Sequence, residues 1–127
     1  MNINIGSDPD FQNILDRFAD GIPATIDCGY GWAELIRKCD SVLFMQDPNY
    51  TVAQIKEKFG GLRFYFNLSN MEEYSKVNSL ILAIEQDSFS VCEKCGEPGY
   101  PHKMEPSGMR YVSCDEHEIH SHISGLG

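Results

Sequence analysis

Apolar residues recur every three or four positions in three stretches of the chain, over about residues 8–20, 32–44 and 70–87. This spacing places them on one face of a helix, and it predicts three amphipathic helices. An Asp-Pro pair opens the first stretch, where an N-cap residue and a first-turn proline are favoured. In the third stretch we expect Leu80 and Leu82 to widen the buried face.

The hydrophobic period changes to two between the second and third predicted helices. Residues 52–59 and 62–67 alternate apolar and polar side chains on the two sides of Gly60-Gly61. This alternation predicts an antiparallel β-hairpin with a glycine turn. The phenylalanines of the segment are expected to pack in the core; they are Phe59, Phe64 and Phe66.

A second, shorter hairpin is predicted over residues 100–112, with a turn at 105–108. The order is then helix, helix, strand, strand, helix and hairpin, which indicates a small α+β fold. Because two strands do not make a stable sheet alone, the helices should pack on the first hairpin. The second hairpin should extend the sheet or cap its end. We expect one compact unit, with a helix-helix-hairpin-helix core in residues 1–90 and a C-terminal module in residues 91–127.

Two pairs of potential metal ligands frame the second hairpin, and two residues separate the partners in each pair. The first pair is Cys92 and Cys95, and the second is Cys114 and His117. One tight turn can aim both members of such a pair at one ion, and Zn²⁺ favours four tetrahedral thiolate or imidazole ligands. We therefore expect a zinc-ribbon or treble-clef-like module with one structural Zn²⁺. A catalytic zinc ion would keep one position for water, whereas these ligands fill all of them.

The cysteines are also compatible with two alternatives to a metal site. The five cysteines among the 127 residues could be unrelated buried thiols, or they could form the disulfides of a secreted protein. The odd number of cysteines and the lack of an apolar N-terminal signal segment favour reduced thiols in a cytoplasmic protein. Cys28 and Cys39 have no comparable pairing, and we interpret them as small packing residues.

Three further histidines accompany the predicted ligands; they are His102, His120 and His122. His120 follows His117 by three residues, so both can face one side of a helix, and His120 or His122 can replace or supplement His117. The spare histidines also leave open a metal-dependent hydrolase or nuclease. In that case they would work beside a second metal ion held by acidic residues of 115–118.

The chain carries a formal net charge of −9. Nucleic-acid binding depends largely on Lys and Arg, so a nucleic-acid-binding zinc ribbon is the third and least favoured hypothesis. No apolar run approaches the length of about 18 residues that a membrane helix needs. The only locally basic stretch contains Lys56, Lys58 and Arg63. Together with Tyr65 they form a candidate partner-binding surface, because Tyr and Arg are frequent in binding hot spots.

Four motifs occur in a characteristic order: GWAELI at 31–36, QIKEKFGGLRFY at 54–65, CEKCGEPG at 92–99 and CDEH at 114–117. This combination resembles a family of small uncharacterised zinc-binding proteins of bacteria and their phages, and the resemblance covers about residues 29–117. It implies a cytoplasmic protein, often encoded by mobile elements, that binds zinc through the four ligands named above. It implies no established activity.

These observations together favour a non-enzymatic interaction protein that a structural zinc ion stabilises. We expect a phage or mobile-element accessory factor that binds a host protein in the bacterial cytoplasm. The support is the acidic balance of the chain and the lack of a nucleophile–base set or a phosphate-binding glycine motif. An acidic surface also fits a protein that binds a basic patch or simply stays dissolved.

Overall fold

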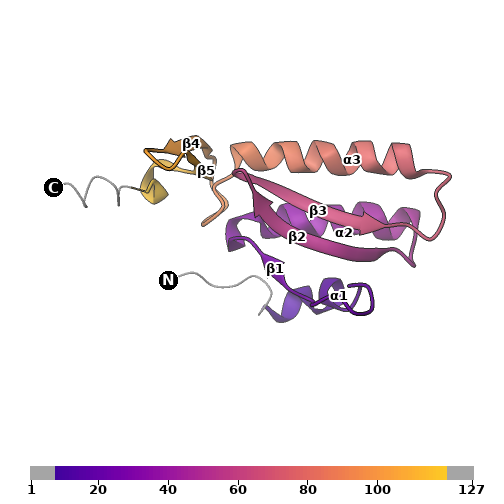
Figure 1. The fold of residues 1–127 in the computed structure, drawn as a ribbon. Helices are drawn as coiled ribbons and strands as arrows, with labels where there is room; N and C mark the ends of the chain where they lie inside the picture. Colours follow the sequence, from indigo (N-terminus) through magenta and orange to yellow (C-terminus); the bar gives the residue numbers. More distant parts are fainter. Residues whose placement is uncertain (1–7, 120–127) are drawn as a thin grey trace.

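The computed structural model describes residues 8–119. Its helices and main strands are α1 (Gln12–Leu15), β1 (Ile26–Asp27), α2 (Ala33–Gln46), β2 (Thr51–Lys58), β3 (Gly61–Asn67), α3 (Tyr74–Asp87), β4 (Tyr100–Met104) and β5 (Met109–Ser113). Strands β1, β2 and β3 form one mixed sheet, and β4 and β5 form a separate antiparallel hairpin (Figure 1). The predicted small α+β fold is confirmed. No helix in the described part of the chain is long and apolar enough to cross a membrane.

Helices α2 and α3 form where the hydrophobic period predicted them, and they pack against each other beside the sheet. In α3 the buried face is a narrow stripe that contains Val77 and Ile81. The prediction that two leucines widen this stripe is wrong, because Leu80 and Leu82 are 43% and 52% exposed. Residues four apart lie above one another on a helix, whereas these two point to its other sides.

The first helix is shorter than predicted. Asp8 caps a 3₁₀ turn at Pro9–Phe11 by accepting a hydrogen bond from a backbone N–H, and α1 then ends at Leu15. The following residues leave the helix because they bond to the start of β2. The N–H of Val52 donates to the Arg17 carbonyl at 2.8 Å, and the Val52 carbonyl accepts from the Ala19 N–H at 3.0 Å.

Strand β1 is absent from the predictions. Ile26 pairs in parallel with Ile55, and Asp27 pairs with Lys56. The strand is two residues long, too short for an alternating pattern to appear in the sequence. It adds a third strand to the predicted hairpin and buries the Ile26 side chain in the core.

The turn between β2 and β3 has Phe59 and Gly60 at its centre, not the predicted Gly60-Gly61 pair. Their φ angles are 54° and 88°, and two positive φ angles are typical of the type I′ turn that suits a tight hairpin. Phe59 is 68% exposed, so the prediction that it packs in the core is wrong. Phe64 is buried, as predicted, and Phe66 is partly buried.

The free edge of β3 is closed by side chains from the end of α3. The N–H of Phe64 donates to Glu85 Oε2 at 2.7 Å, and the N–H of Leu62 donates to the Ser88 hydroxyl at 2.9 Å. An edge strand with paired N–H groups offers no template for another strand at these positions. These bonds also fix the point from which the chain leaves α3 toward the second hairpin.

The second hairpin does not extend the sheet; it lies at the end of the sheet where β2 turns into β3 (Figure 1). A Cβ atom on Gly60 would meet backbone atoms of Arg110 and Tyr111 at 3.3 Å. The tip of the first hairpin therefore rests directly against β5.

Candidate metal centre

The predicted metal ligands lie together at the base of the second hairpin. The ligand atoms of Cys92, Cys95, Cys114 and His117 all lie within 4.8 Å of one another. The sulfurs of Cys95 and Cys114 are 3.7 Å apart, and His117 Nδ1 lies 3.1 Å from the Cys114 sulfur. Zn–S bonds of about 2.3 Å in a tetrahedron separate two sulfurs by about 3.8 Å, whereas a disulfide needs about 2.05 Å. The group can therefore hold one metal ion.

Local backbone turns aim each pair of ligands. In the first pair, the N–H of Gly96 donates to the Cys92 carbonyl at 2.9 Å, and the Cys92 N–H donates to the Glu97 carbonyl at 2.8 Å. Gly96 has a φ of 84°, a conformation that glycine adopts without steric cost. In the second pair, a single 3₁₀ turn, Asp115–His117, follows Cys114 and brings His117 back toward its sulfur.

The electrostatics around Cys92 and Cys95 favour a bound cation. Burial opposes ionisation of Cys92, but backbone N–H groups that point at its sulfur lower the pKa of Cys92 to about 6. The Glu97 N–H favours the Cys95 thiolate, yet desolvation and the two neighbouring sulfurs raise the pKa of Cys95 to about 11. Sulfurs this close repel one another when ionised, so a divalent cation is needed for all of them to carry charge together.

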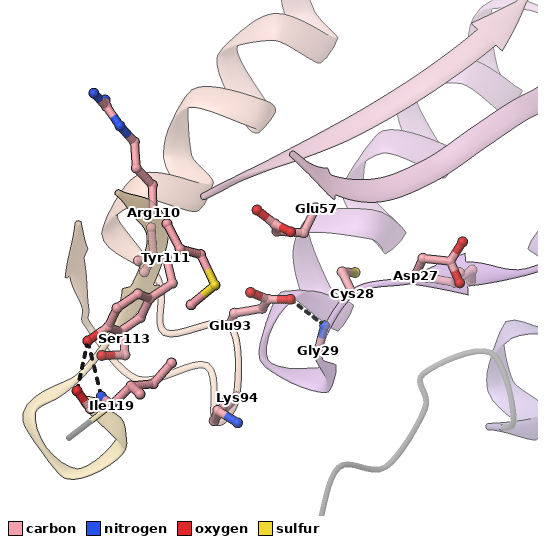
Figure 2. A pocket seen from close by; sticks show the side chains of 13 residues that line it. Asp27, Cys28, Gly29, Glu57, Glu93, Lys94, Arg110, Tyr111, Ser113 and Ile119 are labelled. Carbon is pink, nitrogen blue, oxygen red and sulfur yellow. Dashed lines mark hydrogen bonds between the residues drawn. The ribbon is translucent and has the colours of Figure 1, made fainter. Parts of the chain in front are cut away.

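The turn that carries the first ligand pair, residues 92–96, is called the first metal knuckle, and it packs against a glycine-rich turn of the core at residues 29–31. The Gly31 N–H donates to the Glu93 carbonyl at 2.7 Å, and the Gly29 N–H donates to Glu93 Oε2 at 2.8 Å (Figure 2). A Cβ atom on Gly31 would lie 2.0 Å from the Cys92 carbonyl oxygen. The buried Trp32 donates its ring N–H to the Val91 carbonyl at 2.9 Å. Sequence reasoning missed this contact, although two glycines just before the single tryptophan are its signal.

A cavity of about 410 Å³ lies between the first knuckle, β1 and β5 (Figure 2). Its walls include Cys28 and the carboxylates of Glu57 and Glu93. Burial raises the pKa of Glu93, and the nearby Glu57 raises it further. None of the metal-ligand residues lines this cavity or either of two hollows that lie on the two sides of Phe59 in the β2–β3 turn.

The remaining cysteines and histidines lie apart from the ligand group. Cys39 is buried in the core and Cys28 packs against it, and burial raises the pKa of both thiols. His102 stacks on the Tyr111 ring at a centroid distance of 4.8 Å. His120 and His122 lie outside the described residues. Within residues 8–119, the three cysteines and His117 form the only group with metal-ligand geometry.

The candidate partner-binding residues share one face of the β2–β3 ladder. Lys56 lies directly opposite Arg63, Tyr65 lies opposite Gln54, and Lys58 occupies the next outward position beyond Lys56. Tyr65 is 40% exposed. Ile55 and Phe64 point to the opposite, buried face, so the alternation predicted for this part of the hairpin holds.

Comparisons with protein-family models, with curated proteins and with solved structures return no match for this chain. The structure supports one part of the resemblance to bacterial and phage zinc proteins. This part is the possible metal-binding group of three cysteines and one histidine. The geometry of this group and of the molecular surface is therefore the basis for a functional proposal.

Proposed function

We propose that this protein is a non-enzymatic interaction protein in which one Zn²⁺ fixes the second hairpin to the core. The observation that carries the proposal is the placement of the ligand group. Its four ligand atoms lie within 4.8 Å of one another, as many as a tetrahedral zinc ion takes, and they line neither the cavity beside Glu93 nor the hollows on the two sides of Phe59. A metal ion held in this way has no open position for a substrate, so its contribution is to stability.

The ligand set favours zinc among the metals of the cell. Thiolate ligands select soft or borderline ions, and a tetrahedral set of three sulfurs and one imidazole suits zinc. Such a site needs reduced cysteines, which is consistent with the cytoplasm, and with that of a bacterial host if a phage encodes the protein. The resemblance to small bacterial and phage proteins fits an accessory factor that acts on a host protein.

The outward face of the β2–β3 ladder supplies the proposed binding surface. Lys56 and Arg63 are directly opposite each other, and like charges in that position destabilise a sheet by up to about 1 kcal/mol. Glu85 lies near enough to Arg63 to offset part of this repulsion, and an acidic group of a partner would relieve the rest. Tyr65 adds an exposed aromatic ring next to the two cations, a combination typical of binding hot spots.

Zinc analysis combined with cross-linking in bacterial lysate tests this proposal. We expect one zinc ion per chain, and a specific partner protein that is captured by the wild type. The double variant Lys56→Glu, Tyr65→Ala should lose that partner. Lys76→Glu, on the exposed side of α3, makes the same change of charge and should retain it. Zinc-dependent turnover of a phosphodiester or peptide substrate, with no captured partner, would overturn the proposal.

A further inference from the structure

We propose that a hollow beside Phe59 binds a large apolar side chain of an acidic peptide segment in the partner protein. This inference rests on the proposed function and names the chemistry of the partner. The hollow is lined by Phe59 and Gly60, the two residues that follow Lys58 at the end of β2.

The hollow has the size and the walls of an anchor pocket. Its volume is about 410 Å³, and it lies between the β2–β3 turn, the 3₁₀ turn Ser88–Ser90 that follows α3, and the second hairpin. Apolar and aromatic groups line it, among them Phe59, Phe89, Pro101, Tyr111 and Val112. Pockets of this kind take aromatic or large aliphatic anchors at protein interfaces.

The charge around the hollow has the opposite sign to that of the whole chain. None of its lining residues is acidic, although the chain has a net charge of −9. Lys103 and Arg110 both line it, and they lie directly opposite each other across β4 and β5. This is a second like-charge pair that an anionic partner would relieve.

Arg110 has no side-chain partner in the described part of the chain, and Lys103 has only a weak one. The Arg110 side chain is exposed and makes no ion pair or hydrogen bond with residues 8–119. Figure 2 shows its side chain extending away from Glu57 and Glu93. Lys103 lies 3.9 Å from a carboxylate oxygen of Glu105, but both side chains are more than half exposed, so this pair is weak.

The backbone at Phe59 supports a role for its ring in binding. A bulky residue with a φ of 54° is strained by about 1–2 kcal/mol, and asparagine or glycine would satisfy the same turn without that cost. The strained residue is a phenylalanine that is 68% exposed, and it lines hollows on both sides of the turn. The ring has the Lys58 ammonium 5.6 Å from its centroid, but most of its surface stays exposed, so contacts within the described chain account for only part of it.

Selection from a library of random dodecapeptides displayed on phage tests the inference with the zinc-loaded full chain. We expect enriched peptides that carry Asp or Glu on either side of an aromatic or large aliphatic residue. Affinities of the synthetic peptides are then measured by fluorescence anisotropy for each variant. Phe59→Asn and Arg110→Glu should each weaken binding about tenfold or more. Lys76→Glu should bind as the wild type does, and circular dichroism and zinc content verify the fold of each variant.

Three outcomes would overturn the inference: no enrichment, enriched peptides without an excess of acidic residues, or binding that Phe59→Asn and Arg110→Glu leave unchanged. In the last case the partner-capture experiment separates the two proposals. A partner still captured by these two variants but lost by Lys56→Glu, Tyr65→Ala keeps the proposed function and removes the hollow from it.

Discussion

The backbone N–H of Gly31 donates to the carbonyl oxygen of Glu93 at 2.7 Å, so the core and the metal knuckle share a main-chain contact. Gly31 allows this approach because it has no Cβ; an added methyl group would lie 2.0 Å from the Cys92 carbonyl oxygen. The Gly31→Ala variant should therefore separate the two segments. We expect a loss of stability of about 2 kcal/mol or more, and weaker zinc binding.

Thermal unfolding and zinc competition with a chromophoric chelator measure these two effects. Gly108→Ala is the matched control in the turn of the second hairpin. Gly108 has a φ of 77°, and the nearest atom to an added Cβ is 3.8 Å away, so this variant loses about 1 kcal/mol through backbone strain alone. It should bind zinc as tightly as the wild type. Equal zinc affinities of wild type and Gly31→Ala would contradict the proposed coupling.

Removal of one ligand should release the metal and destabilise the second hairpin. Cys95 is the most informative position, because its side chain is exposed and substitution disturbs little packing. We expect Cys95→Ser to lower the zinc content from one ion per chain toward none, and to lower Tm by an amount close to that caused by a strong chelator.

Cys28→Ala provides the control for a cysteine outside the ligand group. This half-buried thiol packs against the core, so the variant should lose some stability but retain its zinc. A Cys95→Ser protein that keeps a full zinc ion would show that another residue replaces this ligand. The spare histidines at 120 and 122 are then the first candidates for substitution.

The sequence predicts those parts of the fold whose signal is local. The period of α2 and α3, the alternation around Ile55 and Phe64, and the ligand pairs are each contained within a few neighbouring residues. The sequence does not predict the elements that depend on residues far away in the chain. β1 exists because Ile26 meets Ile55, and α1 ends early because the chain bonds to Val52. Neither partner is visible in the segment itself.

The same distinction applies to the candidate site. Spacing identifies Cys92 and Cys95 as a ligand pair, because their geometry is set by one turn. It does not reveal that Gly31 lies under that turn or that Lys103 faces Arg110 beside Phe59. These contacts arise from the packing of the second hairpin on the first, which only the structure supplies.

Phe59→Asn should make the protein more stable. Asparagine tolerates a positive φ, and Asn-Gly is the favoured centre of a type I′ turn. We expect a gain of about 1 kcal/mol, or about 4 °C in Tm. Urea unfolding followed by circular dichroism measures it, and Tyr65→Ala serves as the control for loss of an exposed ring. An unchanged or lower stability would mean that the Phe59 ring makes stabilising contacts that offset its strain.

Glu85 gives stability a pH dependence. Burial raises the pKa of Glu85, although the Phe64 N–H and the Arg63 guanidinium act in the opposite direction. The folded state then binds the proton more tightly than the unfolded state does. The stability that this group contributes is full below its unfolded pKa of about 4.3, and it is lost as the pH rises through the higher folded value.

Glu85→Gln keeps an acceptor for the Phe64 N–H and removes the buried charge. The variant should therefore gain stability over the wild type as the pH rises above about 4.3, where the wild type begins to lose the contribution of protonated Glu85. Chemical unfolding at several pH values tests this difference. Glu72→Gln changes an exposed carboxylate near the start of α3, and its stability should vary with pH in parallel with that of the wild type. If the plot of stability against pH for Glu85→Gln is also parallel to that of the wild type, Glu85 is not the source of the pH dependence.

The contact between Trp32 and Val91 gives the chain an optical signal of its own. Trp32 is the single tryptophan, its side chain is fully buried, and its ring N–H is bonded to the residue before the first metal ligand. Indole emission shifts to longer wavelengths when the ring meets water. Fluorescence excited at the tryptophan band should therefore follow the docking of the knuckle in real time, without any attached dye.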